Sequence, residues 1–588
     1  MDAFKIAFSI LNTKEKINFF IIFFLILLMT ILETFSVGLV LPAIKFLISD
    51  NFANETINFV KNYLGLELEK ENIVIYGLIF ILFFFIFKFF FVAFAVYRQL
   101  MYLFNMLVSK CRYLYSGYIF MDYEEYTRVN PSVLVRNVSL LVDRFNGTLQ
   151  NCFVILTDCL LFLSIFVLLL YFDWKSTLII SGIFLFISSL YYFGTKKRFT
   201  DWGAQAAKYE ALKFKFLYEG LSSMKDIKIS NNLEFFVKSY TKYVSLHGML
   251  SVLRNFVKTL PKLTFEILAV ISLVVVGFVF ISSGKPVEEF IPIAGVFAVS
   301  AFKILPAGNR ILIAFQNLRF DLVSMKILNE EIKKNKENKF YLNFDNKKKG
   351  LYFSKEIKIS NIHFEYKSSN AKILNNINLT IPKNSTIGII GESGSGKSTL
   401  MDIIIGLLNP TKGLISCDGV DIHKNVYSWY NNLGYVPQSI YLIDDTIAKN
   451  IAFGIEDGEI DIKRIQECIE LAKLSEFVKN TKLGIETVVG DKGVRLSGGQ
   501  IQRLGVARAL YKRPEILFFD ESTSSLDTKT EEEMMNSVND LLTGITKIII
   551  SHRIVTLKNC DVIYYIKNGK IFDQGDYKKM SSIKYDKD

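Results

Sequence analysis

Six long apolar segments in the first half of the chain constrain its fold more than any other feature. Each is close to the roughly 20 residues that a helix needs to cross a bilayer. Charged residues make up only 21% of the 588 positions, which fits a chain with a large membrane part. We therefore predict an all-α transmembrane domain over residues 1–322. Its six helices are expected at about 17–41, 73–95, 146–171, 176–194, 263–282 and 288–310.

The connections between these segments differ in length and charge. They are long after the second and fourth segments, so helices two to five are expected to extend beyond the bilayer on one side. Residues 195–258 hold twelve Lys or Arg against five Asp or Glu, whereas residues 42–72 hold three against five. By the positive-inside rule, the amino terminus and both long connections are cytoplasmic in a multi-pass protein of the inner (plasma) membrane. The 42–72 segment is either a short amphipathic helix on the outer surface or a simple connector.

Ionisable side chains also fall inside or at the ends of the spans. Such groups are costly in a bilayer and usually face a cavity or one another. One interpretation is a polar cavity that receives the anionic headgroup of a substrate. The other is that Lys88 and Arg310 reach the interface or pair with Glu33 or Glu266. The candidate substrate-binding cations are Lys88, Lys262, Lys303 and Arg310.

The chain is basic overall, with 69 Lys and Arg against 57 Asp and Glu, and this excess could indicate nucleic-acid binding. The excess is concentrated in the cytoplasmic connections and in a Lys-rich linker expected at 323–355. Membrane topology explains such an asymmetry, so no nucleic-acid partner is expected. The six cysteines form no Cys-x-x-Cys pair, which argues against a zinc site or a disulfide framework.

A second domain, of the α/β class, is predicted over 356–588. An apolar run at 386–390 reads as a buried strand, and it leads into Gly-Glu-Ser-Gly-Ser-Gly-Lys-Ser-Thr and then a helical segment. This is the P-loop pattern in its required strand–loop–helix context, so ATP and Mg²⁺ are the expected cofactors. Lys397 would contact the β- and γ-phosphates, and Ser398 would ligate Mg²⁺. The loop residues expected at the nucleotide are Gly391, Ser393, Gly394, Gly396, Lys397, Ser398 and Thr399.

Two carboxylates follow another apolar run at 516–519. Asp520 has the placement for Mg²⁺, usually through water. Glu521 has the placement of a general base that polarises the attacking water. In isolation the pair could be two exposed acids at a strand end, but an upstream P-loop favours the catalytic interpretation.

Between these two strands stands Leu-Ser-Gly-Gly-Gln at 496–500, and with both phosphate-site motifs the sequence resembles the ATP-binding cassette (ABC) family. The resemblance implies that Ser497, Gly498, Gly499 and Gln500 face ATP held by a second cassette. It further implies that Tyr366 stacks on adenine, that Gln438 assists catalysis and Mg²⁺, that Asp527 lies in the loop joining the cassettes, and that His552 is the switch histidine. Two cassettes must then meet. A homodimer is the simplest assembly, and a heterodimer with a degenerate partner is the alternative.

The order of the two domains resembles type I exporter (type IV) half-transporters. This resemblance implies ATP hydrolysis coupled to export or flipping, with coupling helices near Tyr118–Arg128 and Gly220–Ser230. Within exporters the sequence is similar to lipid-linked oligosaccharide flippases of the PglK type, through Glu33-Thr-Phe, Pro261-Lys262 and Leu305-Pro-Ala-Gly-Asn-Arg310.

That similarity implies a polyisoprenyl-pyrophosphate-linked oligosaccharide moved from the inner to the outer leaflet, with the four cations named above holding the pyrophosphate. Export of lipid A, drugs or peptides on the same scaffold is the alternative. A cassette ATPase acting on ribosomes or DNA is disfavoured by the six spans.

Overall fold

The computed structural model describes residues 2–39, 46, 55, 70–282, 287–337, 351–367, 371–520 and 544–582. It divides into two compact units. The first contains Met1–Met121 and Val129–Leu342, and the second contains Asp122–Arg128 and Asn343–Asp588. Most of the 42–72 segment, with its expected surface helix, lies outside the described residues.

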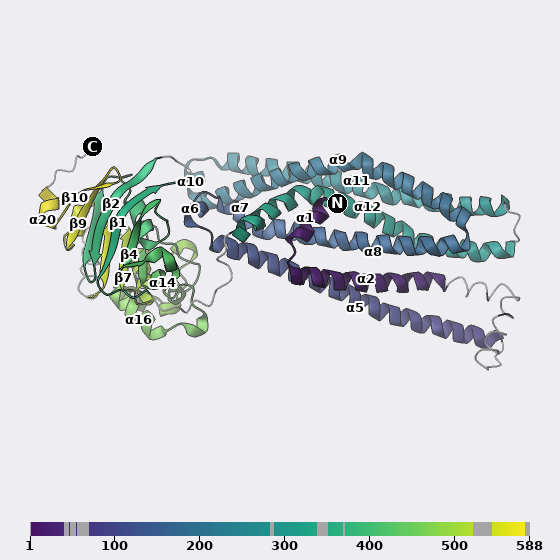
Figure 1. The fold of residues 1–588 in the computed structure, drawn as a ribbon, viewed down its shortest axis with the longest axis horizontal. Coiled ribbons are helices and arrows are strands. Elements are labelled where there is room, and N and C mark those ends of the chain that lie inside the picture. Colours follow the sequence, from purple (N-terminus) through teal and green to yellow (C-terminus); the bar gives the residue numbers. More distant parts are fainter. Residues whose placement is uncertain are drawn as a thin grey trace. The chain divides into compact units, whose positions relative to one another are not determined.

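The described part of the first unit is helical. Its described part contains six helices that are long and apolar enough to cross a membrane, which confirms the prediction of six spans. The helices, in chain order, are α1 (Asp2–Ile10), α2 (Thr13–Gly38), α5 (Lys70–Ile119), α7 (Pro131–Arg136), α8 (Val142–Phe172), α9 (Trp174–Ser222), α10 (Met224–Ile229), α11 (Leu233–Ser282) and α12 (Val287–Glu337), with a π-helical stretch, Asn137–Leu141, before α8 (Figure 1).

Four helices are much longer than a bilayer requires. Helices α5, α9, α11 and α12 contain 50, 49, 50 and 51 residues, so each is about 75 Å long at 1.5 Å per residue. This exceeds the roughly 30 Å hydrocarbon core more than twofold. Residues 323–337, expected in the linker, are instead the last turns of α12, because Met325, Leu328 and Ile332 are buried there among other helices.

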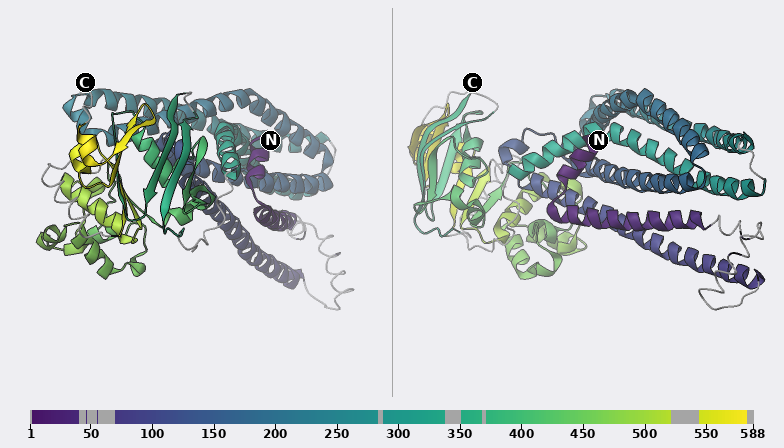
Figure 2. Two further views of the ribbon diagram at one scale, coloured as in Figure 1. Left: turned by 60° about the vertical axis from the view of Figure 1, so that its left-hand side comes forward. Right: turned by 45° about the vertical axis from the view of Figure 1, so that its right-hand side comes forward.

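The long helices lie side by side and pack against one another. Helix α12 lies against α8, α9 and α11, while α2 lies against α5 and α8, as the two further views show (Figure 2). At the start of α2, Asn12 and Glu15 form a capping box. The buried Glu15 carboxylate also accepts a hydrogen bond from Lys110 Nζ of α5 at 2.7 Å. One residue therefore begins α2 and ties it to α5.

The second unit is built on two β-sheets. Within the described residues, one has six strands in the order β10-β9-β3-β8-β7-β6, and the other has four in the order β2-β1-β4-β5. The strands are β1 (Glu356–Glu365), β2 (Lys372–Pro382), β3 (Thr386–Gly391), β4 (Lys412–Cys417), β5 (Val420–Asp421), β6 (Leu433–Val436), β7 (Ile516–Asp520), β8 (Thr546–Ile550), β9 (Val562–Lys567) and β10 (Lys570–Gly575).

Two hydrophobic cores hold this unit together. Helix α13 (Lys397–Ile405) buries Leu400, Met401 and Ile404 in a core shared by residues of both sheets. Helices α16 (Ile462–Leu471) and α18 (Gly498–Tyr511) contribute to the second core, which also takes up residues of the six-stranded sheet. An all-α domain followed by an α/β domain is the predicted fold class, and it is confirmed.

Candidate functional site

The central strands of the six-stranded sheet place the predicted nucleotide residues at one edge. Strands β3, β8, β7 and β6 are parallel neighbours, with Asp520 opposite Ile550 and Val436 opposite Phe519. The carboxyl ends of parallel strands meet at the same edge of a sheet, which is where ligands bind in such folds. The P-loop after β3, Asp520 at the end of β7, His552 after β8 and Gln438 after β6 therefore share this edge.

The conformation of the P-loop explains its glycines. Gly394 and Gly396 have φ of 78° and 103°, in the left-handed region that favours glycine. A Cβ at Gly396 would lie 2.8 Å from Leu374 Cδ2, and a Cβ at Gly391 would lie 2.3 Å from the carbonyl oxygen of Ile566. A Cβ at Gly394 would meet nothing within 4 Å. The loop is thus packed against the sheet on one side and open at Gly394.

Lys397 lies at the centre of this loop. Its Nζ donates hydrogen bonds to the carbonyl oxygens of Gly391 and Glu392, both at 2.8 Å, and the residue is only 5% exposed. Helix α13 starts at Lys397, so the helix N-terminus and the ammonium are at the same end of the helix. Ser393 and Ser398 are exposed beside them. This combination of a cation, the N–H groups of a helix's first turn and an open loop suits phosphate oxygens.

A cluster of oxygen atoms adjoins the end of β7. The Tyr435 hydroxyl donates to Asp520 Oδ2 at 3.4 Å. Burial and the charge of Asp520 raise the pKa of Asp402 to about 6, so the two carboxylates interact. A carboxylate and the Ser398 hydroxyl are the hard oxygen ligands that Mg²⁺ prefers, and the residues present fit the metal. Asp402 and Tyr435 were not predicted from the sequence as site residues. The position of Asp402 on the helix after the P-loop could have identified Asp402.

Tyr366 follows β1 and lies against the helix after the P-loop. Its hydroxyl is 3.4 Å from Thr399 Oγ1. Its ring meets the Phe364 ring edge to face, with 4.9 Å between the centroids. The structure therefore brings the candidate adenine-stacking residue to the P-loop, while stacking on adenine stays a prediction.

The Leu-Ser-Gly-Gly-Gln motif forms the start of α18. Ser497 is the N-cap, and its side-chain oxygen accepts a hydrogen bond from the backbone N–H of Gln500 at 3.3 Å. The Gln500 side-chain oxygen accepts in return from the Ser497 N–H at 2.8 Å. Gly498 and Gly499 lie in the first turn, and Ser497 and Gly498 are exposed. The motif is a second helix N-terminus able to receive an anion.

The remaining catalytic predictions have different outcomes. Gln438 and His552 are both exposed at the sheet edge described above. Glu521 and Asp527 lie outside the described residues, so the general base and the loop between cassettes stay predictions.

One segment of the first half of the chain belongs to the second unit. Asp122–Arg128 contains the short helix α6 (Tyr123–Tyr126), within the stretch expected to hold a coupling helix. The Glu124 carboxylate accepts a hydrogen bond from the backbone N–H of Lys367 at 2.7 Å. The charges of Asp402 and Asp520 contribute, after burial, to raising the pKa of Tyr123. This segment is therefore linked to the neighbourhood of the P-loop.

In the helical unit, two of the candidate cations share one carboxylate. Glu33 Oε2 lies 2.9 Å from Lys88 Nζ and 2.5 Å from Lys303 Nζ. Lys88 Nζ also lies 3.0 Å from Ser36 Oγ. Because these residues come from α2, α5 and α12, the cluster joins three helices and carries a net charge of about +1. The pairing of Lys88 with Glu33 is the alternative that the sequence left open.

Arg310 has a different partner from the two acids considered. Its guanidinium makes two hydrogen bonds to Asp158 of α8, at 2.8 and 2.6 Å. Pairing of Arg310 with Glu33 or Glu266 was one of the alternatives left open by the sequence, and the structure instead pairs Arg310 with Asp158, a buried acid on α8. The side chain of Arg310 is 51% exposed and that of Asp158 is 3% exposed. Lys262 and Glu266 are exposed on α11.

Comparisons with known proteins agree with this arrangement. Residues 374–524 match the family model described as ABC transporter. The chain is 35% identical over 227 residues to the ATP-dependent lipid A-core flippase of Cupriavidus metallidurans, covering 38% of each chain. It is 40% identical over 228 residues to the alpha-hemolysin translocation ATP-binding protein HlyB of Proteus vulgaris, covering 39% of this chain and 32% of the relative.

A solved bacterial Atm1-family ABC exporter with ATP bound matches with a TM-score of 0.74 at 20% identity, covering 94% of this chain and 95% of that one. The curated relatives compared are matched over only about one-third of their length. The chain therefore contains a segment similar to ABC transporter cassettes and shares its fold with that solved exporter.

Proposed function

We propose that the chain is an ATP-driven exporter that couples ATP hydrolysis to transport. The observation that carries this proposal is the meeting of Lys397, Asp520, Gln438 and His552 at one sheet edge, in a chain with six helices able to span a membrane. Lys397 and the N-terminus of α13 bind the phosphates, and Ser398, Gln438 and Asp520 hold Mg²⁺. Bound Mg²⁺ neutralises charge on the phosphate oxygens. Glu521 orients the attacking water and accepts its proton, while His552 contacts the terminal phosphate.

The active assembly in this proposal is a homodimer. The exposed start of α18 supplies hydrogen-bond donors to ATP held by the P-loop of the second copy. A heterodimer with a degenerate partner is the competing assembly. The amino terminus and the cassette face the cytoplasm, and the helices lie in the inner membrane, as the basic connections favour.

The proposed substrate is a polyisoprenyl-pyrophosphate-linked oligosaccharide moved from the inner to the outer leaflet. Support comes from the basic side chains on α5 and α12. Lys303 and Arg310 are seven residues apart on α12, hence about 10 Å apart along one helix face. Lys88, Lys303 and Arg310 outnumber the acids Glu33 and Asp158 by one charge. An added pyrophosphate would gain charge-assisted hydrogen bonds from the partly exposed Lys303 and the exposed Arg310. A substrate role for Lys262 has weaker support. Lys262 is exposed on α11, and this helix carries neither Glu33 nor Asp158, the two acids that pair with the other cations.

A second candidate is export of lipid A, a drug or a peptide. It is favoured by relatives whose names state lipid A-core flipping or hemolysin translocation. The two candidates predict different stimulants of ATP hydrolysis by the purified chain.

Flipping in proteoliposomes tests the proposal. ATP-dependent transfer of a fluorescent polyisoprenyl-pyrophosphate glycolipid is expected for the wild type and should be lost in Glu521→Gln. Replacing Lys88, Lys303 and Arg310 by Gln should impair transfer while leaving basal ATP hydrolysis largely intact. If lipid A or a drug stimulates ATP hydrolysis and the pyrophosphate lipid does not, the second candidate replaces the first. Absence of ATP hydrolysis in the wild type would contradict both.

A further inference from the structure

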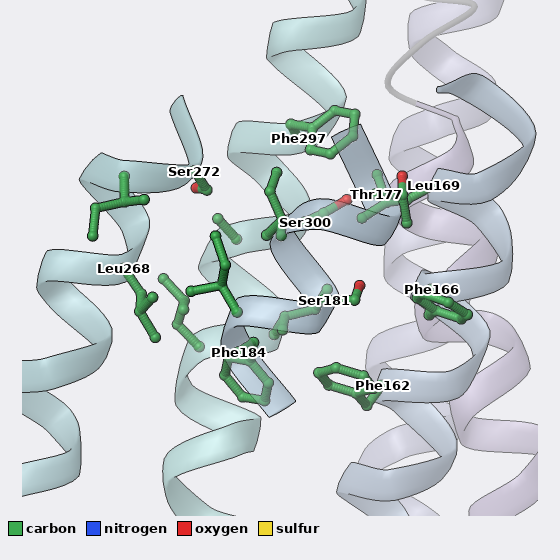
Figure 3. A pocket seen from close by; sticks show the side chains of 16 residues that line it. Phe162, Phe166, Leu169, Thr177, Ser181, Phe184, Leu268, Ser272, Phe297 and Ser300 are labelled. Carbon is green, nitrogen blue, oxygen red and sulfur yellow. The ribbon is translucent and has the colours of Figure 1, made fainter. Parts of the chain in front are cut away.

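A separate cavity lies among α8, α9, α11 and α12 (Figure 3). The space between its lining side chains, together with the open region in front of them, is about 700 Å³. Phe162 and Phe166 line it from α8, Phe184 from α9, Leu268 from α11 and Phe297 from α12. The described lining contains no ionisable side chain, so it differs in chemistry from the cluster of Glu33 and its lysines.

The buried hydroxyl of Ser300 stands out in this cavity because it lacks a hydrogen-bond partner among the described residues. Ser300 is 1% exposed, and its Oγ has no partner within the described part of the chain. By contrast, the neighbouring hydroxyls of Thr177 and Ser272 donate to the carbonyl oxygens of Asp173 and Ala269, at 2.6 and 2.7 Å. Buried hydroxyls are normally satisfied, in helices usually by a carbonyl one turn earlier. The Ser300 hydroxyl is therefore available to an oxygen atom of a ligand.

The cavity has a direction along the helices. In Figure 3, Ser300 and Thr177 lie toward one end, and Phe162 and Phe184 lie toward the other. Thr177 and Phe184 are seven residues apart on α9, which corresponds to about 10 Å. Trp174 and Lys175 begin the same helix, with Lys175 Nζ 5.9 Å from the Trp174 ring centroid. Trp and Lys are residues of the membrane–water interface, so the polar end of the cavity is the end nearer this interface.

The cavity is lined in part by an exposed apolar side chain. Ile271 lines the cavity and is 40% exposed, and the nearby α9 side chains Leu178 and Ile179 are about half exposed. In a membrane-spanning helix bundle these apolar surfaces contact lipid chains. An apolar cavity that stays unfilled costs its lining side chains dispersion contacts. The acyl chains of bilayer lipids are abundant at these surfaces, so they are the occupant we expect in the cavity.

We propose that this cavity binds one acyl chain of a membrane phospholipid. The ester carbonyl of that lipid accepts a hydrogen bond from Ser300 Oγ, its headgroup lies near Trp174 and Lys175, and the first eight or so carbons run toward Phe184. About 10 Å of extended chain at roughly 1.3 Å per carbon fills this length. This bound lipid is distinct from the exported molecule. The proposal depends on the membrane location of the helices and does not depend on which molecule is exported.

The test uses the full chain in lipid nanodiscs that contain a phospholipid with a diazirine in mid-chain. After irradiation, peptide mass spectrometry should find labels on the cavity segments at 162–169 and 180–184. Ser181→Phe, which fills the cavity, should abolish this labelling. Ser189→Phe is the matched control, because residue 189 is on the same helix and exposed, and it should leave the labelling unchanged.

A second variant keeps the test independent of folding defects. Ser300→Ala removes only the hydroxyl, so retention of the diester lipid in native mass spectrometry should fall about two- to tenfold. A diether phospholipid, which lacks the carbonyl, should show a smaller difference between Ser300→Ala and the wild type. Labels spread evenly over all lipid-facing residues, equal labelling in Ser181→Phe, or preferential labelling by a polyprenyl diazirine would each overturn the assignment.

Discussion

At the scale of single residues, Glu33 has the most informative position in the helical unit. One oxygen of its carboxylate, Oε2, contacts both Lys88 and Lys303. These are two of the cations proposed to bind an anionic substrate. The carboxylate therefore stands where a substrate phosphate would stand. Binding of such a substrate must compete with Glu33 or displace it.

Replacing this carboxylate tests the competition. Glu33→Gln leaves two neighbouring ammonium groups uncompensated. Breaking a fully buried ion pair costs roughly 3–5 kcal/mol of unfolding free energy. We expect a smaller loss for Glu33→Gln, because Lys303 is partly exposed. An added pyrophosphate lipid should raise the melting temperature more in the variant than in the wild type. Differential scanning fluorimetry in detergent measures both effects. Glu266→Gln, at an exposed position of α11, is the control and should change neither quantity; equal lipid effects in Glu33→Gln and the wild type would contradict the idea.

Asp418 gives a residue-scale prediction in the cassette. It lies in the turn between β4 and β5, and its carboxylate accepts hydrogen bonds from the backbone N–H groups of Ser354, Lys355 and Glu356 at 2.5, 2.9 and 2.9 Å. Slight burial raises the pKa of Asp418, but these bonds outweigh it and lower the pKa to about 2. A lowered folded-state pKa stabilises the fold above the unfolded value near 3.8, and this stabilisation is lost as the pH falls through about 2.

Asp418→Asn keeps a residue that tolerates the left-handed backbone at this position (φ 48°) and removes the charge. We expect faster amide hydrogen exchange at Ser354–Glu356 and a melting temperature lowered by roughly 2–4 °C. The difference in melting temperature between wild type and variant should be constant from about pH 5 to pH 8 and shrink only below about pH 4. A difference that already shrinks between pH 7 and pH 5 would show that another group is responsible.

At the scale of elements, the contact between α9 and α12 depends on one glycine. A Cβ at Gly203 would lie 2.0 Å from the backbone oxygen of Phe320. Gly203→Ala must therefore separate the two helices, and we expect a loss of about 1–3 kcal/mol in unfolding free energy. Gly194 lies on the same helix, and a Cβ there meets nothing within 4 Å, so Gly194→Ala should be neutral or stabilise by up to about 1 kcal/mol. Equal melting temperatures for the two variants would contradict this close approach.

Elements with a local signal could be predicted from the sequence, and contacts between distant elements could not. The P-loop and Asp520 were predictable because strand, loop and helix follow one another within a few residues. The contact of Glu33 with Lys303 joins positions 270 residues apart, and Asp158 became the partner of Arg310 only through the packing of α8 on α12. The end of α12 was misassigned because its lysines and acids conceal a buried face that includes Leu328 and Ile332.

At the scale of the whole molecule, the proposed homodimer makes each ATP site a joint product of two chains. Lys397 binds phosphate in one copy, and the start of α18 with Ser497 faces that phosphate from the other. Lys397→Ala should therefore abolish ATP hydrolysis in its homodimer, and Ser497→Arg should do so by filling the N-terminus of α18 with a bulky cation. Each substitution disables both sites of a symmetric dimer.

Mixed dimers separate this arrangement from a site completed within one chain. In a dimer of one Lys397→Ala chain and one Ser497→Arg chain, one site carries both defects and the other carries neither. Co-expression with two affinity tags, followed by tandem purification, isolates this species, and we expect it to recover part of the wild-type ATP hydrolysis. A control dimer of two differently tagged Lys397→Ala chains should stay inactive. If Ser497 acted on the P-loop of its own chain, every site in the mixed dimer would be defective, so complete inactivity alongside an active, identically tagged wild-type dimer would exclude the proposed sharing of sites.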